Sequence, residues 1–169
     1  MKISIFYSWQ SDLPNNKNRT LINNCINKAI KQLLESCPRV TEVTLEMDSR
    51  NESGTPDLIE SIFTKIDKCD IFIADISIVN SRPQKRLTPN PNVLLELGYA
   101  AKTIGWSKII CIFNMEFAQI EDLPFDIRSR KPLTYNTTGN MPTTRKLLLK
   151  LLTSSIEEIV NLRLIDKDG

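Results

Sequence analysis

The sequence has 169 residues, with 22 Lys and Arg against 20 Asp and Glu, so its formal net charge is +2. This length suits one globular domain over residues 1–169, and the balanced charge gives no strong attraction toward nucleic acid. Histidine is absent, which excludes Ser-His-Asp and Cys-His catalysis, imidazole bases and histidine-containing metal sites. The five glycines form neither a P-loop nor a GxGxxG motif, which argues against a P-loop ATPase or a Rossmann dehydrogenase.

The cysteines and apolar runs indicate a cytoplasmic setting. The four cysteines form no CxxC or zinc-ligand spacing, so a reduced cytosol fits best. The run over residues 1–7 is too short for a signal peptide, and no apolar run approaches the roughly 18 residues of a membrane span. Basic clusters at 82–86 and 128–131 are short and read as solvated loop segments. We expect no metal, no membrane and no direct nucleic-acid partner.

The first part of the chain alternates strand and helix. Residues 3–7 form a short apolar run that predicts a strand, and the polar residues 8–18 form a loop. Residues 19–36 carry apolar side chains at i, i+1, i+4 and i+5 spacing, which predicts a helix with one buried stripe. A weaker strand follows at 42–47, and a polar loop at 48–55.

The same alternation continues through the middle. A proline in the first turn favours a helix over 56–68. The apolar run 71–74 lacks alternation, which is typical of a central parallel strand buried on both faces. After a loop over 76–89, Asn90 caps a helix predicted over 91–103.

The last part completes the sheet. We expect a buried strand at 108–113, an irregular segment at 115–130, an edge strand at 132–136 and an amphipathic helix at 143–164. This order predicts an α/β three-layer sandwich, with a central, mostly parallel five-stranded sheet and helices on both faces. Ligands of such sheets bind beyond the carboxyl ends of the strands, at the topological switch point. The residues that follow the strands, among them Gln10, Ser77 and Asn114, are therefore the ones to inspect.

Glu96 is the most informative charged residue. It stands in the second turn of an otherwise apolar helix, with Asn92 one turn before it and Tyr99 nearly one turn after it on the same face. An unpaired buried charge is costly, so this carboxylate must be exposed, paired or functional. The plain alternative is a surface glutamate near the positive end of a helix.

Further candidates follow the strands. Asp75 is either a pocket residue or a cap for the turn after its strand. Tyr7 and Trp9 suit stacking on a nucleobase or nicotinamide ring, or else belong to the core and anchor the loop. Arg19 is placed to reach a diphosphate, or is an ordinary charged residue of a first helical turn.

Three segments together resemble the bacterial TIR-like family: SIFYSWQSD at 4–12, CDIFIAD at 69–75 and NPNVLLELGYA at 90–100. The resemblance covers nearly the whole chain, and the branch it looks like is the TIR effectors of antiphage defence that are coupled to cyclic-oligonucleotide sensors such as STING or SAVED modules. It implies a flavodoxin-like (TIR) fold, a catalytic glutamate at Glu96, and a loop at about 49–57 that gates the pocket and self-assembly. Many plant and animal TIR domains have an aromatic residue where this chain has Asn92.

The resemblance implies an NAD⁺ glycohydrolase that releases nicotinamide and either ADP-ribose or cyclic ADP-ribose, with NAD⁺ as substrate and no cofactor. Glu96 would stabilise the transition state and hold the ribose. The residues expected to bind substrate are Tyr7, Ser8, Trp9, Arg19, Asp48, Asp75 and Asn92. Glycosidases usually need a second carboxyl group to protonate the leaving oxygen, but the pyridinium of NAD⁺ leaves as neutral nicotinamide, so the lack of histidine is consistent with this reaction.

The resemblance also implies partners. We expect a homo-oligomer or filament through TIR–TIR contacts, and a sensor domain or partner protein that responds to a cyclic nucleotide; the chain is then either one domain of a larger protein or has a separate sensor. Two alternatives stay open. One is a nucleoside deoxyribosyltransferase-like enzyme, which also uses a glutamate on a comparable helix; the other is a non-enzymatic adaptor that self-associates.

Overall fold

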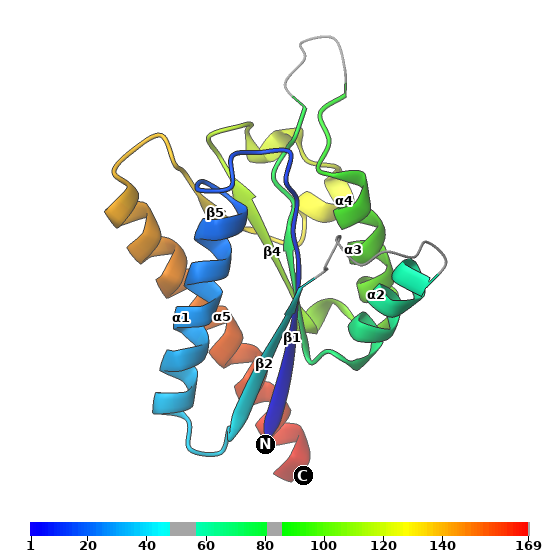
Figure 1. Ribbon diagram of the computed structural model, residues 1–169, viewed down its shortest axis with the longest axis vertical. Coiled ribbons are helices and arrows are strands. Elements are labelled where there is room, and N and C mark those ends of the chain that lie inside the picture. Colours follow the sequence, from blue (N-terminus) through cyan, green and yellow to red (C-terminus); the bar gives the residue numbers. More distant parts are fainter. Residues whose placement is uncertain (48–56, 81–85, 169) are drawn as a thin grey trace.

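The centre of the molecule is a five-stranded sheet (Figure 1). The structure is a computed structural model and describes residues 1–47, 57–80 and 86–168. The strands are β1 (Lys2–Ser8), β2 (Glu42–Met47), β3 (Ile71–Asp75), β4 (Ile109–Asn114) and β5 (Leu133–Tyr135). Their order is β2-β1-β3-β4-β5, and all four neighbouring pairs are parallel.

Helices cover both faces of the sheet. α1 (Arg19–Ser36) and α5 (Met141–Asp168) pack on one face, while α2 (Asp57–Lys68) and α3 (Pro91–Thr103) pack on the other (Figure 1). Three short helices complete the described part of the chain: η1 (Trp106–Lys108), η2 (Ile120–Asp122) and α4 (Phe125–Arg128). The result is the flavodoxin-like three-layer α/β sandwich that the sequence predicts, and its strand order is the doubly wound one.

Strand periodicity divides the core in two. Ile3, Ile5 and Tyr7 of β1 belong to the cluster under α1 and α5, whereas Phe6 belongs to the cluster under α2 and α3 and stacks on Phe72 at 5.8 Å between ring centroids. Side chains alternate along a strand, so every second residue of β1 faces the same helical layer. Burying one such side chain stabilises the fold by about 1.5–3 kcal/mol.

The predicted elements and the observed ones agree closely, with strand ends within one residue of the prediction, and the main differences are as follows. The segment 115–130, expected to be irregular, contains the short helices η2 and α4. The last helix runs over 141–168 rather than 143–164, and the sheet is parallel throughout. The predicted helix start at Pro56 lies outside the described residues. Within the described part, no helix combines the length and apolar character needed to cross a membrane.

The topology places the switch point between β1 and β3. The chain leaves β1 toward α1 on one face of the sheet, and it leaves β3 toward α3 on the opposite face. The carboxyl ends of these two strands are therefore where a doubly wound sheet binds its ligand.

Candidate active site at the carboxyl end of the sheet

Glu96 lies on the buried face of α3. Its side chain is 7% exposed and shares the sheet-facing stripe with Val93, Leu97 and Ala100. The sequence left Glu96 exposed, paired or functional, and the phase of the helix turns it inward with these apolar residues. A carboxylate held among apolar neighbours must be stabilised by hydrogen bonds or charge, because its burial is otherwise too costly.

The start of α3 is fixed by its own sequence. The Asn90 side chain accepts hydrogen bonds from the backbone N–H groups of Asn92 and Val93 at 2.9 and 3.3 Å, and Pro91 occupies the first helical position. This is a side-chain cap of the kind that satisfies the free N–H groups of a first turn. Glu96 follows about one and a half turns later, so the start of the helix determines where the Glu96 side chain lies and which way it points.

Ser8 supplies the partner of Glu96 from β1. It is the last residue of the strand, is fully buried, and its Oγ donates to Glu96 Oε2 at 2.5 Å. Because strand side chains alternate, Ser8 faces the same layer as Phe6, which is the α3 side. A short O–H···O⁻ contact of this kind is a strong, charge-assisted hydrogen bond. Two residues 88 positions apart in the sequence thus form the centre of the site.

Trp9 and Arg19 contact each other at the two ends of the β1–α1 connection. Trp9 is buried, and the guanidinium carbon of Arg19 lies 3.4 Å from the centroid of the indole ring. This is the geometry of a cation–π contact. The two side chains that the sequence offered separately, one for stacking and one for a diphosphate, are therefore a contacting pair.

Tyr7 points away from Glu96. It is fully buried in the cluster under α1 and α5, and burial raises its pKa well above the ordinary value. Among the described residues, its hydroxyl is the buried side-chain polar atom that makes no hydrogen bond. The structure therefore places Tyr7 in the core, which the sequence left as the alternative to lining a pocket.

Asp75 is the hub of a buried polar network. It ends β3, is fully buried, and accepts from Gln10 Nε2 at 2.9 Å, Asn18 Nδ2 at 3.0 Å, and the Ser77 backbone N–H and Oγ at 3.1 and 2.6 Å. Burial raises the pKa of Asp75, and the hydrogen bonds from Ser77, Asn18 and Gln10 oppose that rise. Its oxygens are occupied by protein donors, so Asp75 holds the β1–α1 segment and does not face a substrate.

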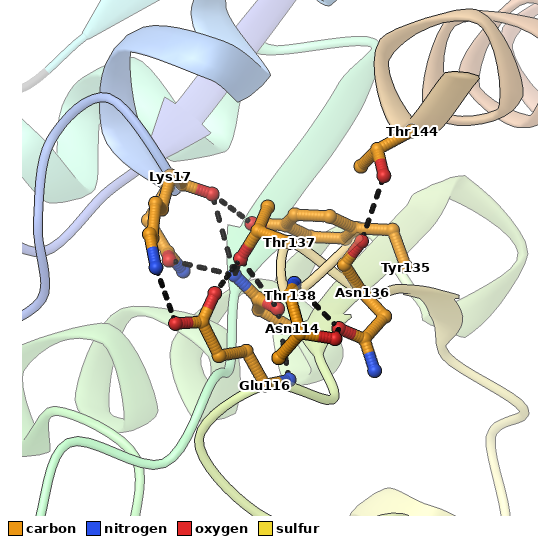
Figure 2. Close-up of polar contacts among 9 residues, drawn as sticks. Lys17, Asn114, Glu116, Tyr135, Asn136, Thr137, Thr138 and Thr144 are labelled. Carbon is orange, nitrogen blue, oxygen red and sulfur yellow. Dashed lines mark hydrogen bonds and ion pairs between the residues drawn. The ribbon is translucent and has the colours of Figure 1, made fainter. Parts of the chain in front are cut away.

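The network continues to the ends of β4 and β5 (Figure 2). Asn114 Nδ2 donates to Thr137 Oγ1 at 2.9 Å, and Tyr135 Oη donates to the Lys17 carbonyl oxygen at 2.9 Å. Lys17 forms an ion pair with Glu116, which also accepts a hydrogen bond from Thr137. Burial works to raise the pKa of Glu116, but the contacts from Lys17 and Thr137 outweigh it and lower that pKa.

The remaining predicted residues divide into two groups. Asn92 is exposed at the start of α3, so it does not join Glu96 on the buried stripe. Asp48 and the loop positions 49–56 lie outside the described residues. In the described part of the chain, no cluster of three Cys, Asp or Glu is arranged to hold a metal ion.

The sequence reasoning missed most partners in the network. It marked Gln10, Ser77 and Asn114 only as residues that follow strands, and it did not single out Asn18 or Thr137. The available signal was their position beyond strand ends, because amides and hydroxyls collect where parallel strands leave backbone groups to satisfy.

One family matches the chain. The family described as "CAP12/Pycsar effector protein, TIR domain" matches residues 22–127, which is more than half of the chain and includes Glu96 and Asp75. Ser8 and Trp9 precede the matched span. No curated protein sequence matches the chain.

Two solved structures are similar at low identity. A 2-desoxiribosyltransferase from Leishmania mexicana is 19% identical with a TM-score of 0.44; the match covers 66% of this chain and 64% of that one, so this chain spans less than two thirds of its length. The CMP N-glycosidase BcmB from Clostridium botulinum is 20% identical with a TM-score of 0.44, and the match covers 88% of this chain and 96% of that one.

Proposed function

Because the chain belongs to the CAP12/Pycsar effector TIR-domain family, we propose that it is an NAD⁺ glycohydrolase. In this proposal it cleaves the bond between nicotinamide and ribose, releases nicotinamide with ADP-ribose or cyclic ADP-ribose, and depletes NAD⁺ as an effector of antiphage defence. The observation that carries the proposal is the Glu96 carboxylate, buried on α3 and hydrogen-bonded by Ser8 at the carboxyl end of β1.

The chemistry needs one well-placed carboxylate. As the C–N bond of NAD⁺ breaks, positive charge develops on the ribose, and nicotinamide leaves as a neutral base without an acid. A fixed carboxylate beside the ribose stabilises that charge most where water is excluded. Glu96 also accepts hydrogen bonds from ribose hydroxyls. Water then attacks the anomeric carbon, and the hydrolysis yields nicotinamide, ADP-ribose and one proton.

Ser8 keeps the carboxylate in position. Its hydroxyl donates to Oε2 of Glu96 and so restricts the rotation of that side chain. Less side-chain entropy is then lost when the substrate binds. Trp9 follows Ser8 in the chain and packs in the cluster under α1 and α5, where its indole contacts the guanidinium of Arg19. The indole suits an aromatic ring of the substrate, and the guanidinium suits its diphosphate.

The proposal includes assembly and a signal. We propose that copies of the domain associate in the active state and that a sensor for a cyclic nucleotide controls the association. NAD⁺ is the substrate and no cofactor takes part. Turnover should then rise more steeply than in proportion to protein concentration, and a strictly linear dependence over a wide range would contradict this part.

The test is NAD⁺ cleavage by concentrated protein with a crowding agent, with products separated by chromatography. Glu96→Gln keeps size and hydrogen bonding but removes the negative charge, so we expect at least a thousandfold loss of nicotinamide release. The matched control is Glu121→Gln, on an exposed position of η2. Ser8→Ala should reduce turnover about tenfold to a hundredfold.

Deoxynucleosides are assayed in parallel as substrates. Base release or exchange from deoxynucleosides, with NAD⁺ left intact, would replace the proposal with a deoxyribosyltransferase-like activity. Folded, assembled protein that binds nucleotide without any turnover would identify an adaptor. Full activity of Glu96→Gln in a clean preparation would remove Glu96 from the mechanism.

A further inference from the structure

Side-chain hydrogen bonds in the described part of the chain join the end of β1 and the β1–α1 segment to α3. One is the bond from Ser8 to Glu96 at 2.5 Å, and another is the bond from Asn90 Nδ2 to Asp12 Oδ2 at 2.6 Å. Asn90 uses both ends of its amide, because its oxygen caps α3 while its nitrogen reaches the segment. The same residue therefore starts the helix and ties it to the strand-end loop.

Other residues of the β1–α1 segment are hydrogen-bonded to β3. Gln10 and Asn18 both bind Asp75 at the end of β3. Asp12 lies between them in the sequence and is exposed, so packing does not dictate its place. An exposed carboxylate that meets a buried amide at short range is explained by that amide's need for an acceptor. Asp12 thus extends the anchorage of the segment from β3 to α3.

α3 begins directly after Asn90, the residue whose side chain contacts Asp12. Just before Asn90, the chain forms an antiparallel bridge between Ile78 and Pro89, and next to it the Val79 N–H donates to the Thr88 carbonyl at 3.1 Å. Asn90 directly follows this bridge and caps α3. Glu96 follows six residues later, about 9 Å along the helix axis. A shift or tilt at the cap is therefore transmitted to the carboxylate.

We propose that Asp12 and Asn90 are a positioning pair, which sets α3 against the β1–α1 segment and thereby holds the Glu96 carboxylate against Ser8. The inference rests on the proposed function, in which Glu96 is the reacting group. The pair acts through Glu96, so its loss misplaces the carboxylate. A misplacement on the order of 1 Å costs about a hundredfold in rate. The effect falls on kcat, with KM for NAD⁺ within about twofold of the wild type.

The experiment exchanges the two partners. Asn90→Asp keeps the oxygen that caps α3, removes the amide donor and sets two carboxylates against each other. We expect kcat to fall at least tenfold while the melting temperature stays within a few degrees. Asp12→Asn keeps an acceptor oxygen and should lose less. The double variant restores a donor and an acceptor in exchanged positions, and its kcat should return to within about threefold of the wild type.

A second readout does not need activity. Trp9 lies in the same segment, and Trp106→Phe leaves it as the sole tryptophan. In that background, acrylamide quenching of Trp9 fluorescence should rise in Asn90→Asp and return to the starting value in the double variant. If the wild-type chain does not cleave NAD⁺, the proposed function fails and this quenching cycle alone decides the pairing.

Three results would overturn the positioning pair. One is an Asn90→Asp variant with unchanged kcat and unchanged quenching. A second is a double variant that stays as impaired as Asn90→Asp, because this would assign the defect to charge at the helix start and not to the pair. A melting temperature that falls in parallel with kcat in every variant would reduce the pair to a structural contact and also overturn the inference.

Discussion

The Asp75 hub makes a prediction about stability that the structure allows to be estimated. Asp75→Ala removes the acceptor on which donors from Gln10, Asn18 and Ser77 converge. The Asn18 amide keeps its second bond, to Ser77 Oγ at 3.1 Å. The Gln10 amide, the Ser77 backbone N–H and the Ser77 hydroxyl lose their acceptor. All these residues are fully buried, so bulk water does not reach them in the folded protein.

The cost follows from these three donors. A buried donor without an acceptor costs about 1–3 kcal/mol, so the three together cost roughly 3–9 kcal/mol. The substitution also removes the penalty of burying the carboxylate, which is the effect that raises the pKa of Asp75. This gain offsets part of the cost, so the net loss is about 3–5 kcal/mol, in the lower part of that range. This is a large share of the about 5–15 kcal/mol that stabilise a domain.

Urea unfolding followed by tryptophan fluorescence measures the loss, with exposed Asp126→Ala as the control, expected within about 0.5 kcal/mol of the wild type. The pH dependence adds a second test. Because the folded pKa of Asp75 lies above its ordinary 3.8, the folded protein binds the proton more tightly. The free energy of unfolding therefore falls as pH rises from 3.8 through the folded pKa of Asp75, and the Asp75 contribution is constant above that pKa. The Asp75→Ala variant should lack this fall. A loss below about 1 kcal/mol for Asp75→Ala would refute a sealed network, since it would mean that water satisfies the donors.

Two further predictions concern other ionisable groups. The Lys17 and Thr137 contacts lower the folded pKa of Glu116 below 4.5, so Glu116→Gln should cost about 1 kcal/mol at pH 7, and the difference should shrink as pH falls below 4.5; a difference that stays constant down to acid unfolding would contradict this. Burial raises the pKa of Cys25, of Cys69 to about 11 and of Cys111 to about 12, while Cys37 is half-exposed. A thiol-specific disulfide reagent at pH 8 should therefore modify one cysteine rapidly in the folded protein and all four after unfolding, and rapid reaction of two or more would be inconsistent.

The fold could be predicted from the sequence because its elements carry strong periodic signals. The helix over 19–36 and the buried strand at 71–75 present long apolar patterns whose period depends only on local geometry. The short helices η2 and α4 have no such pattern. They are three and four residues long, and η2 is held by two reciprocal hydrogen bonds, in which the side chains of Gln119 and Asp122 each accept from the other residue's backbone N–H. Contacts of this size do not stand out in a sequence.

The site could be predicted only in part, for a different reason. Glu96 and Ser8 were separate candidates, one on a helix and one after a strand, and their contact depends on the phase of α3 and on the alternation along β1. The same alternation turns Tyr7 to the other layer, although it precedes Ser8 directly. Lys17 meets Glu116 across 99 positions. Pairings of this kind follow from topology, which local patterns do not encode.

The Asp75 network also decides which part of the switch point is open to chemistry. Gln10, Asn18, Asp75, Ser77 and Asn114 are all fully buried, so side chains fill the crevice between β1, β3 and β4, where many doubly wound proteins hold a ligand. These five buried residues form the floor of the crevice, whereas the carboxylate proposed to react lies on α3 and accepts a hydrogen bond from Ser8 of β1. The floor and the reacting group are therefore distinct sets of residues. Substitutions in the floor should lower stability first, whereas Glu96→Gln should abolish turnover in a protein that unfolds at nearly the same urea concentration. If Glu96→Gln instead destabilised the fold as much as Asp75→Ala does, Glu96 would belong to the floor and the reaction would need another carboxylate.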